Sequence, residues 1–178
     1  RIWERRTVVH QPLRVTIGRG TWRRAAAIDT DDRRALPPDL LVAVDRSERL
    51  TDVAVPLTVA PGDVVALHGD LDGSMALARS IIVQLATWYG PADWRLVIET
   101  NRPGDWEWTT WLPHTLHDTG PTNPEHAIVV VTDNPAALAA RTGPLRRFID
   151  STAAAAIVIT PFDESVPSVY SEVLEVGP

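Results

Sequence analysis

Residues 64–75 read VVALHGDLDGSM, an apolar run that leads through two glycines into an amphipathic segment. An uninterrupted run such as 64–68 is typical of a strand that is buried on both faces of a parallel sheet. We expect Ser74 to cap a helix that extends to Tyr89 and carries one apolar stripe, formed by Met75, Ala78, Ile82 and Leu85. This strand–turn–helix unit indicates an α/β fold.

The same alternation continues toward the C-terminus. Strands are expected at 95–99, 127–132, 155–160 and 172–176, and short helices at 135–141 and 145–151. Strands that alternate with helices imply right-handed crossovers. The prediction for residues 61–178 is therefore a three-layer α/β fold, with a mostly parallel, P-loop-NTPase-like sheet and helices on both of its faces.

Residues 1–60 have a different pattern, of short strands with turns, and are interpreted as a β-rich N-terminal extension that packs on the core. Strands are expected at 13–17, 40–44 and 53–59, a turn at 18–20, and mostly loop at 23–38. The whole chain has 178 residues, so the two parts together have the size of one globular unit.

Composition argues against several functions. The net charge is −6, so we expect no nucleic-acid binding by this domain alone, and the arginine pairs at 5–6, 23–24 and 146–147 are interpreted as solvated faces. The absence of cysteine excludes disulfides and thiolate metal sites. No apolar run approaches the roughly 20 residues that span a bilayer. All 17 basic residues are arginine, so the chain has no lysine that could contact a bound phosphate.

The glycine turn follows the first buried strand, where ligands of such sheets bind. A working phosphate loop, G-x-x-x-x-G-K-[ST], holds phosphate and magnesium with backbone amides, a lysine and a hydroxyl. Here Gly69 and Gly73 are one residue closer together, and Ser74 follows the second glycine directly. Asp70 and Asp72 would repel phosphate, and the chain offers no lysine.

A second nucleotide motif is also incomplete. Asp133 follows the strand at 127–132, but Asn134 stands where a glutamate that orients water is expected. We therefore expect no catalytic residue, no ATP hydrolysis and no cofactor in this domain. The degenerate nucleotide site comprises Gly69, Gly73, Ser74 and Asp133.

Tryptophans supply the candidate interface. Tryptophan is enriched at binding hot spots, so we expect at least one of Trp106, Trp108 and Trp111 to contact a partner and the others to pack a short helix onto the sheet. No metal site is predicted, because Pro113 and a loop context oppose a zinc cluster and no EF-hand pattern follows the aspartates. The residues considered were His114, His117 and His126 for zinc, and Asp29, Asp31 and Asp32 for calcium.

Four blocks of this sequence resemble one protein family. They are residues 2–6 (IWERR), residues 13–18, the glycine turn, and residues 106–114 (WEWTTWLPH). The family is that of the FtsK/SpoIIIE-type ATPases of actinobacteria, especially the EccC/EssC motor of type VII secretion. The resemblance implies a degenerate, ATPase-like domain that precedes the true motor domains. It also implies a hexameric, ATP-driven parent that is anchored in the cell membrane and transports protein or DNA, with this domain on the cytoplasmic side.

Three functional hypotheses follow. The leading one is a non-catalytic domain that couples or docks the motor through contacts with its other domains and subunits, or with proteins of a membrane complex. The second is a regulatory domain that binds nucleotide without hydrolysing it. The third is an NTPase that is active only with residues from a neighbouring subunit, although a missing phosphate lysine is not easily supplied in that way.

Overall fold

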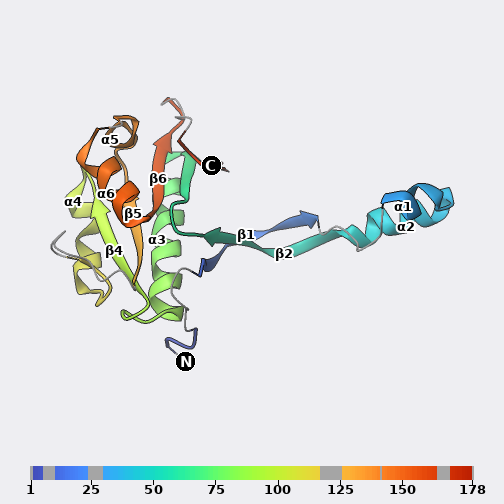
Figure 1. Ribbon diagram of the computed structural model, residues 1–178, viewed down its shortest axis with the longest axis horizontal. Helices are drawn as coiled ribbons and strands as arrows, with labels where there is room; N and C mark the ends of the chain where they lie inside the picture. Colours follow the sequence, from blue (N-terminus) through green and yellow to red (C-terminus); the bar gives the residue numbers. More distant parts are fainter. Residues whose placement is uncertain are drawn as a thin grey trace. The chain divides into compact units, whose positions relative to one another are not determined.

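The computed structural model describes residues 2–5, 11–23, 30–116, 126–140, 142–163 and 169–177 (Figure 1). The chain forms two compact units, one of Arg1–Val15 with Thr58–Pro178 and the other of Thr16–Leu57. The first is the α/β unit. It includes the N-terminal residues, which the sequence analysis assigned to the extension.

A five-stranded parallel sheet forms the centre of the α/β unit. Its strands lie in the order β4-β5-β6-β3-β7, so that β3 is flanked by β6 and β7; Leu67 of β3, for example, pairs with Ile159 and Leu174. The predicted fold class is confirmed. The bounds of the strands are Val64–Gly69 for β3, Trp94–Glu99 for β4, Ala127–Thr132 for β5, Ala155–Pro161 for β6 and Glu172–Val176 for β7.

Helices cover both faces of this sheet. The long helix α3 (Leu71–Trp88) packs against β3 and β6, and its predicted apolar stripe is buried. The helices α5 (Pro135–Ala139) and α6 (Pro144–Thr152) pack through Leu138, Leu145 and Ile149 on a cluster that contains Val130 and Val158. Successive residues of a strand point to opposite faces, so the remaining strand residues face α3.

The second unit contains a two-stranded sheet and two helices. The strands β1 (Leu13–Arg23) and β2 (Arg49–Val59) extend into it, and α1 (Thr30–Ala35) and α2 (Pro38–Glu48) lie between them. The predicted strand at 40–44 is wrong, since these residues belong to α2. Pro38 at the start of the helix and Asp39 in its first turn favour this outcome, because a short apolar run alone does not distinguish strand from helix.

Two smaller predictions for this region also fail. The turn expected at 18–20 is continuous strand, and part of the loop expected at 23–38 is the helix α1. Within the unit, the carboxylate of Glu48 is buried and accepts two hydrogen bonds from the guanidinium of Arg33, at 2.7 and 2.9 Å. A bidentate pair of this kind satisfies a charge that would otherwise be costly to bury.

His114 is a buried polar residue of the α/β unit. Its ring stacks on Trp94, with centroids 4.8 Å apart, and Nε2 lies 3.0 Å from the carbonyl oxygen of Tyr89. A carbonyl only accepts, so Nε2 carries the proton and donates it. Burial is the main cause that lowers the pKa of His114, and the native state therefore holds the neutral ring.

This burial makes stability depend on pH. The unfolded chain protonates His114 at about pH 6.5 whereas the folded chain resists it, so the stabilisation is complete above that pH and is lost as the pH falls. We expect denaturant unfolding to show a loss of stability between about pH 7.5 and 5.5 that is smaller in His114→Gln. The control His126→Gln alters a partly exposed ring and should keep the wild-type dependence. An unchanged dependence in His114→Gln would contradict this assignment.

Candidate functional site

The carboxyl edge of the sheet has its topological switch point between β3 and β6. The connection after β3 leads to β4 on one side of the sheet, and the connection after β6 leads to β7 on the other side. Ligands of open α/β sheets bind in the crevice at such a point. The predicted site residues Gly69, Gly73 and Ser74 are located here, at the end of β3 and the start of α3.

No loop separates β3 from α3. The strand ends at Gly69, Asp70 is the N-cap, and the helix begins at Leu71, so Gly73 and Ser74 lie in its first turn. The prediction that Ser74 caps the helix is therefore wrong. Aspartate is as good an N-cap as serine, and Asp70 comes first after the strand.

The N-cap side chain binds a backbone amide of the kind that would bind phosphate in a nucleotide site. The backbone amide of Gly73 donates to Oδ2 of Asp70 at 2.8 Å. Free amides at a helix N-terminus are the donors that hold phosphate in a nucleotide site. In this protein the side-chain carboxylate of Asp70 accepts a hydrogen bond from one of these amides, that of Gly73.

The end of β7 fills the adjacent space. The amide of Asp70 donates to the carbonyl oxygen of Val176 at 3.1 Å, and a Cβ added to Gly69 would lie 2.0 Å from the same oxygen. A Cβ added to Gly73 would lie 3.1 Å from Cγ1 of Val176 and 3.5 Å from the carbonyl oxygen of Gly177. Both glycines thus allow close approach of another strand, rather than of a ligand.

Ser74 is oriented into the interior. Its side chain is fully buried, and its Oγ has no hydrogen-bond partner among the described residues. In a working loop the corresponding hydroxyl binds magnesium. Here it lies within the packed first turn of α3.

Asp133 is held by the end of β4. Its carboxylate accepts hydrogen bonds from Oγ1 of Thr100 at 2.7 Å and from the amide of Asn101 at 2.9 Å. The strand that it follows, β5, is separated from β3 by β6. The structure therefore places Asp133 at the same edge of the sheet as Gly69, but its oxygens are used to join two strand ends.

The tryptophans differ in their environment. Trp106 ends α4 (Pro103–Trp106) and is only 2% exposed, with the Arg79 guanidinium 5.8 Å from its ring centroid. Trp108 is half-buried, and Trp111, at the end of the 3₁₀ helix η1 (Glu107–Trp111), is 87% exposed. Their interface role stays a prediction, for which Trp111 offers the exposed ring.

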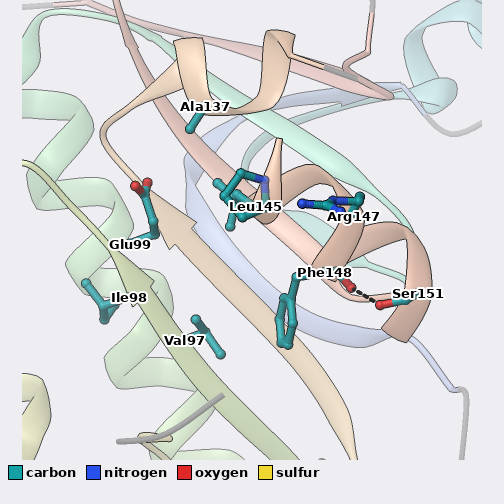
Figure 2. Close-up of a pocket in the computed structure, with 9 residues that line it drawn as sticks. Val97, Ile98, Glu99, Ala137, Leu145, Arg147, Phe148 and Ser151 are labelled. Atoms are coloured by element: carbon teal, nitrogen blue, oxygen red, sulfur yellow. Dashed lines mark hydrogen bonds between the residues drawn. The ribbon is translucent and has the colours of Figure 1, made fainter. Parts of the chain in front are cut away.

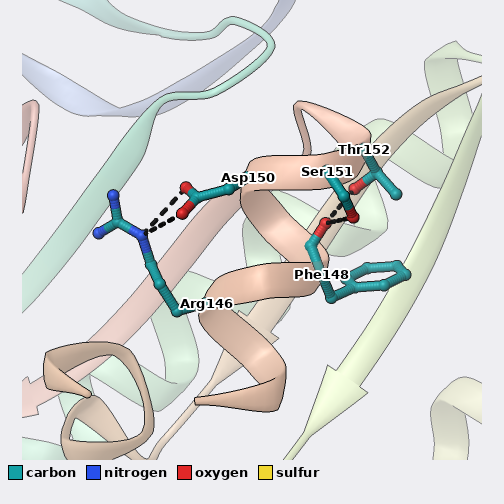
Figure 3. A network of polar contacts seen from close by, with 5 residues as sticks. All are labelled: Arg146, Phe148, Asp150, Ser151 and Thr152. Atoms are coloured by element: carbon teal, nitrogen blue, oxygen red, sulfur yellow. Dashed lines mark hydrogen bonds and ion pairs between the residues drawn. The ribbon is translucent and has the colours of Figure 1, made fainter. Parts of the chain in front are cut away.

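Sequence reasoning missed a pocket on the α6 side of the sheet (Figure 2). Its volume is about 630 Å³, and the side chains of Val97, Leu145 and Phe148 line it together with the charged Glu99 and Arg147. In α6, Ser151 and Thr152 donate to the carbonyl of Phe148, and Arg146 pairs with Asp150 at 3.0 Å (Figure 3). The spacing of four between Arg146 and Asp150 indicates this ion pair in the sequence, but neither residue lines the pocket.

The metal hypotheses gain no support. Among the described residues, no group of three His, Asp or Glu side chains is arranged to hold a metal ion. His114 lies in the core, whereas His117 and Asp29 are outside the described residues. In the same part of the chain, no helix is long and apolar enough to span a bilayer.

The fold and the edge of the sheet define a class of protein, the three-layer α/β proteins with a P-loop-like arrangement. No protein-family model matches the chain. Its sequence is similar to the ESX secretion system protein EccC of Thermomonospora curvata, with 30% identity over 128 residues, which is 67% of this chain and 10% of that protein.

Two proteins of Mycobacterium tuberculosis are also similar. The ESX-5 secretion system protein EccC5 is 30% identical over 128 residues, 64% of this chain and 9% of that protein. The ESX-1 secretion system protein EccCa1 is 37% identical over 57 residues, 31% of this chain and 8% of that protein. The chain thus spans about a tenth of the length of these relatives, and the resemblance to EccC proteins is confirmed.

The contact between β3, α3 and β7 can be tested with one methyl group. Gly69→Ala should destabilise the protein by about 1–3 kcal/mol or more, because the new Cβ meets the backbone of Val176 rather than a flexible side chain. Gly104→Ala is the matched control, since nothing lies within 4 Å of its Cβ position. Equal stability of the two variants in denaturant unfolding would show that β7 does not lie against Gly69.

Proposed function

We propose that this domain is a non-catalytic, P-loop-like part of an EccC-like secretion protein and that it acts through contacts with other proteins or domains. The observation that carries the proposal is the occupied helix N-terminus: the Asp70 carboxylate accepts from the Gly73 amide, and Val176 lies against Gly69. A phosphate group in this position would have to displace both.

Electrostatics favour the same conclusion. A phosphate near the first turn of α3 would face the carboxylates of Asp70 and Asp72, and the chain contains no lysine to compensate. Arg79 is engaged elsewhere, with its Nη2 3.6 Å from the carboxylate of Asp105. Like charges at a few ångströms disfavour binding, most strongly where water is excluded.

The similarity to ESX secretion system proteins supplies the context of the proposal. In it, the parent protein is a membrane-anchored, hexameric, ATP-driven translocase, with nucleotide bound by its other domains. The present domain lies on the cytoplasmic side of the membrane and contacts the other domains and subunits of the motor. Trp111 is the proposed anchor of such a contact, since a large exposed aromatic ring is typical of binding hot spots.

The first test concerns nucleotide. With ATP and magnesium at millimolar concentration, we expect phosphate release equal to a blank without protein, and no heat of binding in a calorimetric titration. The physical reason is the occupied Gly73 amide together with the missing lysine. Turnover that disappears in Asp133→Ala would refute the proposal, whereas binding without turnover would favour the regulatory, nucleotide-binding function.

The second test distinguishes tryptophans that contact a partner from tryptophans that pack in the core of the domain. Trp111→Ala should weaken assembly with the rest of the motor by about 2 kcal/mol or more and leave the melting temperature of the domain unchanged, because its ring is exposed. Trp106→Ala is the matched control and should lower stability by about 3–5 kcal/mol, because its ring is buried. Normal assembly of Trp111→Ala, measured by co-purification, would remove Trp111 from the proposed interface.

A further inference from the structure

The C-terminal end of α3 is closed by a segment far away in the sequence. The last four carbonyls of a helix have no partner within the helix. One of them, Leu85, accepts from the amide of Tyr89 at 2.9 Å. The other three accept from the N-terminal residues: Ala86 from Nε1 of Trp3 at 2.9 Å, Thr87 from the amide of Trp3 at 2.8 Å, and Trp88 from the amide of Arg5 at 3.0 Å.

Side chains add to these backbone contacts. The guanidinium carbon of Arg5 lies 4.1 Å from the centroid of the Trp88 ring, a cation–π arrangement. The ring of Trp3 meets the buried ring of His114 edge to face, at 6.3 Å. The aromatic side chain of Trp3 and the cationic side chain of Arg5 therefore both contact rings of the α/β unit.

The backbone of Trp3 is in the left-handed region, with φ at +59°. Bulky residues rarely adopt this conformation, and they keep it only where surrounding contacts require it. In this conformation the amide and the indole N–H of Trp3 reach consecutive carbonyls of α3. The strain thus indicates a specific fit and not an incidental contact.

A small apolar pocket continues this contact surface. Its volume is about 270 Å³. Ile2 and Trp3 form one side of it, and the other side consists of Val83, Ala86, Thr87, Leu112, Pro113 and His114. One short segment, residues 2–5, contacts all of these groups at the end of α3: the three carbonyl oxygens, the Trp88 ring and the pocket.

We infer that the C-terminal end of α3 is a peptide-binding site that recognises a Trp-x-Arg segment. In this chain residues 2–5 occupy it in cis, and the same segment of a second copy can occupy it in trans. The contacts described above depend on the backbone, the indole and the guanidinium of the segment, which a separate peptide also carries. This inference is independent of the proposed function, since it concerns the opposite end of α3 from Asp70.

The test uses the full chain with a weakened segment, Trp3→Ala with Arg5→Ala. A fluorescently labelled peptide of sequence RIWERR, titrated in an anisotropy assay, should bind this double variant at least tenfold more tightly than it binds the wild-type protein. The reason is that the wild-type segment competes in cis. The peptide RIAERR should lose this binding. Equal affinity for both proteins, or no binding to the double variant up to millimolar peptide, would overturn the inference.

Hydrogen exchange provides a second readout that does not depend on peptide affinity. In the double variant, the amides of residues 85–89 should exchange at least tenfold faster while those of β5 stay protected, and added RIWERR should restore the protection. Phe162→Ala, which alters an exposed aromatic residue outside the segment, is the control and should leave these amides unchanged. If the double variant does not fold, Arg5→Ala alone should produce a smaller increase in the same turn. Faster exchange spread over the whole sheet in Arg5→Ala would overturn the inference.

Discussion

The hydrogen bond between the Gly73 amide and the Asp70 carboxylate is the interaction on which the edge of the sheet depends. Because the cap immediately follows β3, the helix starts within one residue of the strand and leaves no loop that could surround a phosphate. The same arrangement brings Gly69 against Val176, so that the last strand closes over the start of the helix. A P-loop-like topology is thus combined with a helix N-terminus whose Gly73 amide is bound by the chain's own carboxylate.

The long helix α3 contacts distant parts of the chain at both ends. Val176 accepts a hydrogen bond from the amide of the N-cap Asp70, which directly precedes the helix, and Trp3 and Arg5 contact its C-terminal side. Helix ends usually rely on nearby residues or water for their unpaired amides and carbonyls. In this protein they connect the first residues, the middle and the last strand of the α/β unit into one continuous set of contacts.

Much of this fold was predictable because buried parallel strands are long apolar runs. The runs that became β3, β5 and β6 contain almost no polar residue, and such runs flanked by turns and helices indicate an α/β sheet. The prediction for 40–44 failed because a short apolar run alone does not distinguish strand from helix, and Pro38 and Asp39 at its start favour a helix.

The position of the glycines between a buried strand and a helix was predictable, but their contacts were not. The spacing of Gly69 and Gly73 and the lack of lysine were visible in the sequence. That Asp70 would cap the helix in place of Ser74, and that Val176 would lie against Gly69, depends on contacts between strands that are distant in the sequence. Likewise, residues 2–6 were recognisable by resemblance alone, and the contacts of Trp3 and Arg5 with the end of α3 became visible only in three dimensions.

The capping contact at Gly73 also has a consequence for binding equilibria. A protein that binds a ligand only in its folded state becomes more stable as the concentration of that ligand rises. The carboxylate on the Gly73 amide belongs to the chain, so its local concentration is constant, and a phosphate would have to compete with it for this amide at every nucleotide concentration. Under the proposed function, the start of α3 therefore presents the same surface at every nucleotide concentration.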